Sequence, residues 1–345
     1  MEKPIKFTRK KNLLMNKNSL KGITLLLIGS FIWGTTFVAQ SMGTNHLNAF
    51  SFNCIRNFIG VFALMPVLLW QISTGIKTTY KSPDTHICKS SATEQHEDTH
   101  SLFIHIRTGL KTIFTQDLFL GGLACGTALC LASYFQQLGI ESSTVGKSAF
   151  ITTLYIVLVP LLGLFFKKKL PLQIWCGVIL AMIGLYLLCM KDEAFVLTTG
   201  DIYLLLCAFF FTIQITAVDY FAPKVNCIAL SMMQFLVTAV LSGIGMMFTE
   251  LPTLENIYGA LIPLLYAGVL SSGIAYTFQI IGQKHLAPAV ASLLMSLESV
   301  FATLAGWIVL KEVLTTKELI GCGLVFAAVI LTQIPLPSKK EQAVS

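Results

Sequence analysis

The chain has 345 residues, of which 54% are hydrophobic and only 12% are charged, and this composition excludes an ordinary soluble domain. Its formal net charge is +7, from 24 basic and 17 acidic residues. Because the basic residues lie mainly in polar segments between long apolar stretches, the charge is typical of a membrane protein and does not indicate nucleic-acid binding.

Ten apolar stretches of about 20 residues follow one another along the chain, each long enough to cross a hydrocarbon core of about 30 Å as a helix. Uninterrupted apolar stretches do not suit the alternating strands of a membrane barrel. The sequence therefore predicts an all-α integral membrane protein with ten transmembrane helices. In chain order, they cover 20–42, 49–72, 116–138, 144–166, 171–190, 200–221, 226–248, 257–282, 287–309 and 317–336.

The ten stretches form two sets of five that align with each other. A shift of 178 residues places Leu26 on Leu204, and three further identical pairs begin at Leu27, Phe31 and Ala39. A shift of 143 residues matches eight more positions with identical residues, namely Phe135, Gln136, Gly139, Leu154, Val157, Leu161, Gly163 and Lys168. Because five is an odd number, the halves enter the membrane from opposite sides. Inverted repeats of this kind are typical of alternating-access transporters.

The polar segments predict the orientation and the division of the chain. A basic tail at 1–19 precedes a first five-helix repeat at 20–190, and a second repeat at 200–336 precedes a tail at 337–345. Nineteen of the 24 basic residues fall on the side that holds both ends. The positive-inside rule therefore predicts that both termini are cytoplasmic.

A long loop at 73–115 distinguishes the first repeat from the second. It holds four of the six histidines, with a cysteine and acidic residues among them: His86, Cys88, Glu94, His96, Glu97, Asp98, His100 and His105. Imidazole and carboxylate groups at short spacing can bind zinc. The alternative is a solvated polar insertion with histidines by chance. Because the spacing matches no zinc pattern, we predict no metal site and no cofactor.

Only three charged residues lie at least three residues from both ends of a predicted span. Polar groups are costly inside a bilayer, so such residues are candidates for a function. Arg56 lies seven residues into the second span, and its guanidinium could attract a carboxylate-bearing substrate; a structurally paired arginine is the alternative. Lys147 lies near the same face, and the alternative there is a lysine reaching for lipid headgroups. Glu298 lies near the middle of the ninth span, so it must pair, become protonated or face water.

The 143-residue shift places Glu298 on Tyr155, so both repeats have a polar side chain at the same depth. Other amphipathic side chains surround these positions, and Gln136 and Gln279 are matched by the repeat. Polar groups at symmetric positions predict a substrate cavity near the midplane, although single glutamines also serve as interhelical hydrogen-bond partners. The predicted substrate-binding residues are Trp33, Gln40, Arg56, Tyr134, Gln137, Lys147, Tyr155, Gln214, Tyr276, Gln279 and Glu298.

Four regions resemble the EamA family of the drug/metabolite transporter superfamily. They are GKSAFITTLYIVLVPLLGLFFKKKLPLQIWCGVILAMIGLYLL at 146–188, SLLMSLESVFATLAGWIVLKEVLTTKELIGCGLVFAAVIL at 292–331, FIWGTTFVAQ at 31–40 and the region of Arg56. The resemblance implies ten helices in two inverted five-helix repeats, a central cavity and the export or exchange of small metabolites. It also implies Glu-Pro in the ninth span, whereas Ser299 follows Glu298 here. The missing proline predicts a softer kink.

These observations together predict a secondary transporter of small organic metabolites in the bacterial inner membrane, with protons or facilitated exchange as the driving force. Arg56 and Lys147 are expected to set the electrostatics of an outer vestibule. One alternative is a membrane-embedded enzyme for lipid-linked substrates, but the acidic residues near span ends show no catalytic spacing. The other is a sensor or scaffold that uses the histidine-rich loop.

Overall fold

The computed structural model describes residues 17–74, 112–167, 170–189, 198–249, 251–311 and 314–334. The basic tail up to residue 16, most of the histidine-rich loop and the tail at 337–345 lie outside the described residues. Among the residues that are described, no group of three or more His, Cys, Asp and Glu side chains is placed to hold a metal ion.

Every regular element in the described part of the chain is a helix. Up to residue 189 the helices are α1 (Lys17–Gly43), α2 (Ala49–Ser73), α4 (Gln116–Glu141), α5 (Val145–Thr152), α6 (Tyr155–Phe165) and α7 (Leu172–Cys189). After it they are α8 (Thr199–Phe221), α9 (Cys227–Phe248), α10 (Leu254–Gly259), α11 (Leu261–Leu265), the π-helix η1 (Tyr266–Tyr276), α12 (Thr277–Gln283), α13 (Pro288–Met295), α14 (Leu297–Leu310) and α15 (Thr316–Gln333).

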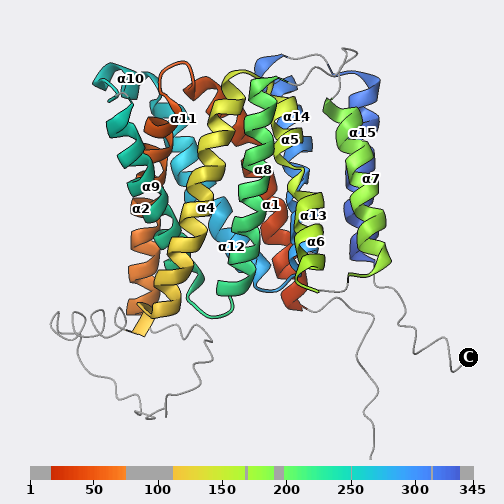
Figure 1. The fold of residues 1–345 in the computed structure, drawn as a ribbon, viewed down its shortest axis with the longest axis horizontal. Helices are drawn as coiled ribbons and strands as arrows, with labels where there is room; N and C mark the ends of the chain where they lie inside the picture. The colour runs from red at the N-terminus through yellow and green to blue at the C-terminus, as the bar shows by residue number, and fades with distance from the viewer. Residues whose placement is uncertain are drawn as a thin grey trace, which may run out of the picture.

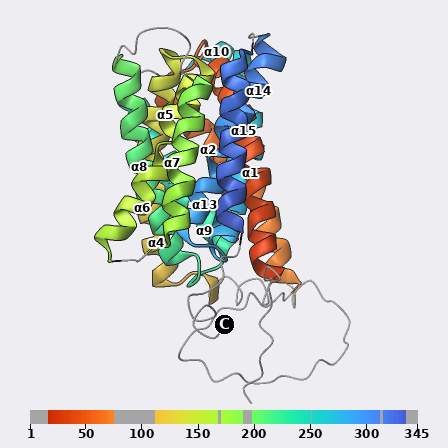
Figure 2. The same cartoon turned by 90° about the vertical axis from the view of Figure 1, so that its right-hand side faces the viewer.

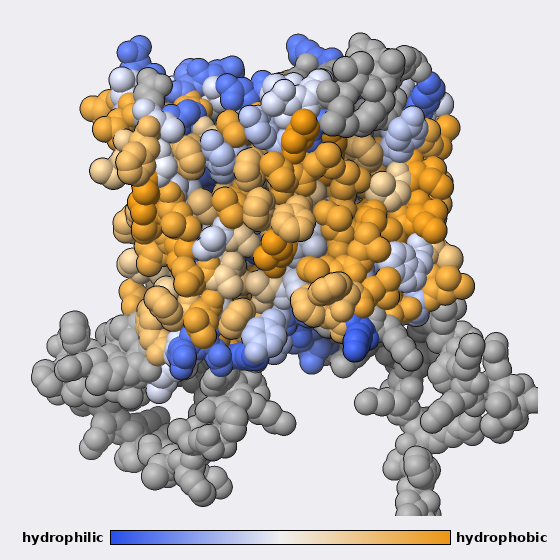
Figure 3. Space-filling model, viewed as in Figure 1, coloured by the Kyte–Doolittle hydropathy of each residue, from blue (hydrophilic) through white to orange (hydrophobic). Residues whose placement is uncertain are grey.

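Within the described ranges, nine helical segments are long and apolar enough to cross a membrane. Three of these segments each consist of two or three consecutive elements: α5 and α6, then α11, η1 and α12, and finally α13 and α14. The stretch predicted at 171–190 is helical as α7, but its apolar part, Leu172–Leu188, is shorter than the other nine. On the face shown in Figure 3, an apolar band crosses the middle of the molecule and hydrophilic residues gather at both ends. The protein is therefore a helical, multi-pass membrane protein.

Polar residues at the helix starts define where the helices begin. In seven helices of the described chain, the residue before the first turn accepts a hydrogen bond from a backbone N–H of that turn; these residues are Asn48, Thr115, Thr144, Thr198, Asn226, Thr253 and Thr315. The first N–H groups of a helix have no partner within the helix, and short polar side chains supply one. The caps thus mark the ends of the apolar segments.

The helices surround α1, which packs against α14, η1 and α12 (Figure 1). On one side, α4 packs along α8 and α9, and α2 packs along α9 and η1. At the opposite edge, α7 and α15 lie side by side (Figures 1 and 2). Their backbones touch, since a Cβ atom on Gly321 would lie 2.5 Å from the carbonyl oxygen of Gly184. Small residues permit such close approach between membrane helices.

Two spanning segments are interrupted near their middle. The segment of α5 and α6 breaks at Thr153 and Leu154, and that of α13 and α14 breaks at Ser296. The ninth predicted span is thus interrupted at Ser296 although no proline follows Glu298. The Ser296 hydroxyl donates to the carbonyl oxygen of Leu293 at 2.7 Å, and Ser299 N–H donates to the carbonyl oxygen of Ser296 at 3.1 Å. Serine side chains that bond to nearby backbone compete with the helical pattern, so proline is not needed for the break.

Candidate functional site

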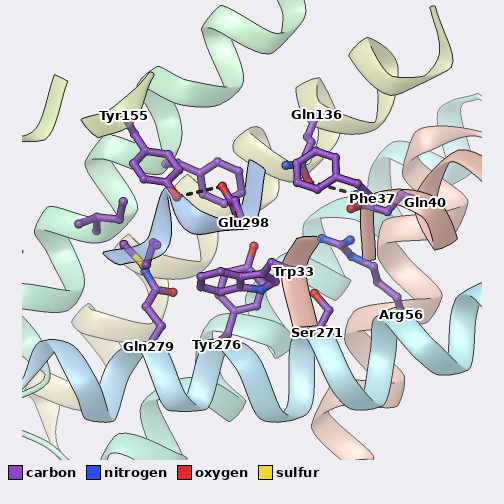
Figure 4. A pocket seen from close by; sticks show the side chains of 13 residues that line it. Trp33, Phe37, Gln40, Arg56, Gln136, Tyr155, Ser271, Tyr276, Gln279 and Glu298 are labelled. Carbon is purple, nitrogen blue, oxygen red and sulfur yellow. Dashed lines mark hydrogen bonds between the residues drawn. The ribbon is translucent and has the colours of Figure 1, made fainter. Parts of the chain in front are cut away.

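A cavity lies in the centre of the bundle and is partly open; about 430 Å³ of space between atoms belongs to it, including space open to solvent. Nine elements contribute to its wall (Figure 4). The lining residues are Trp33, Phe37 and Gln40 of α1, Arg56 of α2, Gln136 of α4, Tyr155 of α6, Phe211 and Ile215 of α8, Ser271 and Tyr276 of η1, Gln279 of α12, Met295 of α13 and Glu298 of α14. The wall thus combines aromatic rings, amides and two opposite charges.

The Glu298 carboxylate lies beside the two helix interruptions. Its Oε1 accepts a hydrogen bond of 2.9 Å from the Tyr155 hydroxyl (Figure 4). At the neighbouring residues, Thr153 Oγ1 lies 2.5 Å from Ser299 Oγ, which also donates to the carbonyl oxygen of Ala149 at 3.0 Å. The interruptions of α5–α6 and α13–α14 therefore contact each other, and this contact fixes Tyr155 and Glu298 at the cavity wall.

The Arg56 guanidinium points into the same cavity from α2 (Figure 4). The residue is only 2% exposed, and its Nε has no hydrogen-bond partner within the described chain. Its Cζ lies 5.9 Å from the centre of the Phe52 ring. No ion pair with Arg56 exists among the described residues, although both Arg56 and Glu298 line the cavity. A buried charge without a partner is costly, so its presence in the wall is a strong sign of ligand binding.

Aromatic side chains form the apolar part of the wall. The rings of Trp33 and Tyr276 meet edge to face with centroids 4.9 Å apart, and Tyr155 and Phe211 meet in the same way at 6.5 Å. Trp33 Nε1 is a buried donor that has no partner in the described part of the protein. Flat rings with one free donor suit an organic ligand with an apolar body and a polar group.

Glutamines form two hydrogen-bonded groups at the cavity. In the first, Gln40 Nε2 donates to Gln136 Oε1 at 3.1 Å and to Gln137 Oε1 at 3.2 Å. In the second, Gln279 Nε2 donates to Gln214 Oε1 at 3.1 Å, and its own Oε1 has no partner among the described residues. Gln40, Gln136 and Gln279 line the cavity, whereas Gln137 and Gln214 lie outside it and accept hydrogen bonds from Gln40 and Gln279, respectively.

The structure brings seven of the eleven predicted residues to the cavity: Trp33, Gln40, Arg56, Tyr155, Tyr276, Gln279 and Glu298. Arg56 lies in this cavity and not in a separate vestibule. Gln137 and Gln214 lie one layer outside it. Tyr134 stacks on Phe50 with ring centroids 4.1 Å apart, and it does not line the cavity.

Lys147 lies away from the cavity and is part of an ion pair. Its Nζ is 2.8 Å from Asp201 Oδ2, and Asp201 is 1% exposed. Asp201 Oδ2 also accepts a hydrogen bond from Thr198 N–H at the start of α8. Lys147 therefore joins α5 to α8, which explains its position better than an interaction with lipid headgroups.

The predicted substrate-binding set lacks six wall residues, one of which, Gln136, the repeat matches with Gln279. Phe211 could have been predicted from the sequence, because the 178-residue shift places it on Trp33. Ser271 belongs to the π-helix η1, and the sequence does not predict the wider turn of a π-helix. The other three are Phe37, Ile215 and Met295, which look like any apolar residue of a membrane helix.

Comparison with known proteins identifies the family. The model of the EamA-like transporter family matches residues 20–82 and 198–334. The chain belongs to the EamA-like transporter family. A protein of Archaeoglobus fulgidus named as an uncharacterized transporter is 26% identical over 311 residues, which are 90% of this chain and 84% of that protein. A solved crystal structure aligns with a TM-score of 0.67 over 91% of this chain and 96% of its own, at 15% identity, and this likeness concerns the fold alone.

Proposed function

We propose that the protein is a secondary transporter that exports or exchanges small organic metabolites across the bacterial inner membrane by alternating access. Membership of the EamA-like transporter family supports transport, and not catalysis, as the activity. The observation that carries the proposal is the central cavity, because Arg56 and Glu298 face it without an ion-pair partner among the described residues. Binding a solute there would compensate charges that the fold leaves unpaired.

Ten helices in two inverted five-helix repeats, at 20–190 and 200–336, are the architecture that we propose for this transport. Helix α7 would be the fifth spanning helix in spite of its shorter apolar part. Two features support the repeat. The α5–α6 and α13–α14 segments are interrupted at positions related by the 143-residue shift, and Tyr155 and Glu298, which are 143 residues apart, share a hydrogen bond. Contacts between equivalent positions are expected on a pseudo-two-fold axis.

The proposed orientation places both termini in the cytoplasm. The positive-inside distribution of the basic residues supports it. The start of α1 and the end of α15 also lie at the same end of the bundle (Figure 1). In this orientation, the solute site would open alternately to the two membrane faces as one repeat rocks against the other. Protons carried by Glu298, or exchange of one solute for another, would drive the net flux.

Purified protein in vesicles tests the proposal, with a mixture of metabolites in place of a single chosen solute. Vesicles would be loaded with a cell metabolite extract, diluted with and without a pH gradient, and analysed by mass spectrometry over time. We expect at least one solute class to leave faster than from protein-free vesicles, and Glu298→Gln to remove the difference. Tyr186→Phe is a matched control, because Tyr186 of α7 is 55% exposed on the outer surface. If no solute leaves faster in either gradient, the proposed function is wrong.

A further inference from the structure

The charged residues of the cavity wall indicate which charge the bound solute carries. Of the thirteen lining residues, only Arg56 and Glu298 carry a formal charge, and their signs are opposite. Within the described chain, neither is part of an ion pair, so no Arg56 nitrogen lies within 4.0 Å of a Glu298 carboxylate oxygen. Arginine stays protonated in proteins, so the cation of the cavity is permanent, whereas a carboxylate can take up a proton.

The elements around Glu298 offer it no other cation. Its titratable neighbours are Tyr155 from α6, Tyr276 from η1 and Cys207 from α8. Helix α5 contributes Lys147, which is paired with Asp201. The other elements that pack against α14 have either no charged residue, as in α7 and α13, or charges confined to their first turns, as in α1 and α15. Arg56 and Glu298 therefore control the net charge of this cavity.

Net charge is costly when a site moves through a low-dielectric membrane. With Glu298 ionised and no solute bound, the charges of Arg56 and Glu298 sum to zero. One bound monoanion would leave the site with a charge of minus one, unless a proton joins a Glu298 carboxylate oxygen at the same time. The site is then neutral both with and without its solute.

We propose that the cavity binds a monovalent organic carboxylate at Arg56 together with one proton on Glu298, an inference that rests on the proposed transport function. The carboxylate accepts hydrogen bonds from the guanidinium, and the free Trp33 Nε1 is a further donor in the same wall. Trp33, Phe37 and Phe211 enclose an uncharged, apolar body. The proton comes from water when the anion binds, forms an O–H bond on Glu298, and returns to water when the anion leaves.

A zwitterion is the competing ligand. Its carboxylate would face Arg56 and its ammonium group would face an ionised Glu298. That complex is neutral without a proton, so a zwitterion binds with no proton uptake. The two ligand classes thus differ in a measurable quantity.

Calorimetric titration of the purified protein tests the proposal. The probes are sodium formate, butyrate and benzoate, each with its primary amide, and phenylalanine as a zwitterion. Titrations in buffers of different ionisation enthalpy, at pH values from about 6 to about 9, give the number of protons taken up. We expect at least one carboxylate to bind at least about tenfold more tightly than its amide, with proton uptake that approaches one per anion as the pH rises.

Three variants separate the parts of the proposal. Arg56→Gln is expected to lose the preference for carboxylate over amide. Glu298→Gln, which is neutral from the start, is expected to keep carboxylate binding with no proton uptake. Tyr186→Phe is expected to behave like the unaltered protein. A merely destabilised variant would not show binding that persists while proton uptake is lost.

The proposal is overturned if no carboxylate binds, since formate is too small for the cavity to exclude. Carboxylate binding without proton uptake at any pH, or binding of phenylalanine alone, overturns it as well. These outcomes differ from failure of the transport function. If vesicles move a cation or a zwitterion but no carboxylate, the protein is a transporter and only the anion–proton inference fails.

Discussion

Two regions of the molecule hold buried carboxylates in opposite ways. Near one end of the bundle, Asp201 lies 2.8 Å from Lys147 and also caps the start of α8. In the central cavity, Glu298 accepts a hydrogen bond from Tyr155, and the Arg56 charge that shares the cavity is not paired with it. The charge of the first carboxylate is paired within the protein through Oδ2, although its Oδ1 has no hydrogen-bond partner among the described residues, whereas the charge of the second is not paired there. The difference separates a group that holds helices together from a group that is available to a solute.

The physical reason is the cost of desolvation. A buried charge is tolerated when geometry and hydrogen bonds replace the water it has lost. Asp201 meets this condition at Oδ2, which pairs with Lys147 and accepts the Thr198 N–H, while its Oδ1 has no described partner. Arg56 has neither an ion pair nor a partner for its buried Nε among the described residues. Neutralising Glu298 should therefore affect transport, whereas neutralising Asp201 should affect stability.

The largest expected effect is the loss of flux in Glu298→Gln. We expect proton-driven transport in vesicles to fall to the level of protein-free vesicles, because the amide cannot take up and release the proton. We expect the temperature of unfolding to stay the same or rise, because an amide is less costly to bury than a carboxylate. The measurements are solute efflux and thermal unfolding of the same preparation. Normal pH-driven flux in this variant would exclude Glu298 as the proton carrier.

The contact between α7 and α15 involves close packing and no charge, so a substitution there shows what packing alone contributes to stability. We expect Gly321→Ala to lower the free energy of unfolding by about 1–3 kcal/mol, because overpacked contacts cost that much and the new Cβ would lie 2.5 Å from the Gly184 carbonyl oxygen. Gly323 is a matched control on the same helix, since a Cβ atom there meets nothing within 4 Å. Gly323→Ala should be neutral or slightly stabilising. Equal unfolding temperatures for both variants would contradict the tight α7–α15 contact.

Asp201→Asn is the counterpart of the Glu298 substitution. We expect it to lower the free energy of unfolding by about 1 kcal/mol, since the partly exposed Lys147 loses its ion pair while asparagine still caps α8. Solute flux should persist. Thermal unfolding and vesicle efflux are the two measurements. Loss of flux with unchanged stability would show that Asp201 belongs to the transport machinery, and the contrast between the two regions would disappear.

The sequence predicts the helices, and it draws attention to Arg56 and Glu298, for the same physical reason. Lipid penalises exposed backbone and buried charge, so long apolar segments and the rare Arg56 and Glu298 within them are visible in the sequence. The repeat also places Tyr155 and Glu298 at one depth, but their hydrogen bond is a finding of the structure.

Other features depend on contacts that hydropathy does not encode. Lys147 and Asp201 are 54 residues apart, and no sequence pattern predicts their ion pair. A methionine in the cavity wall, such as Met295, has the same apolar character as one that faces lipid. The π-helix η1 likewise comes from a run of residues that would equally suit an α-helix.

The smallest expected effect concerns the pH dependence of stability, at a histidine that lies near two lysines. His285 lies between α12 and α13, outside the spanning segments, and burial, followed by the charges of Lys284 and Lys21, lowers its pKa below the ordinary value of 6.5. The unfolded chain then binds a proton more readily than the folded one as the pH falls below about 6.5. This group therefore contributes stability above that pH and loses it in more acidic solution. Thermal unfolding between about pH 7 and about pH 5 should show a smaller decline in His285→Gln than in the unaltered protein, and identical declines would show that these lysine charges do not act on His285.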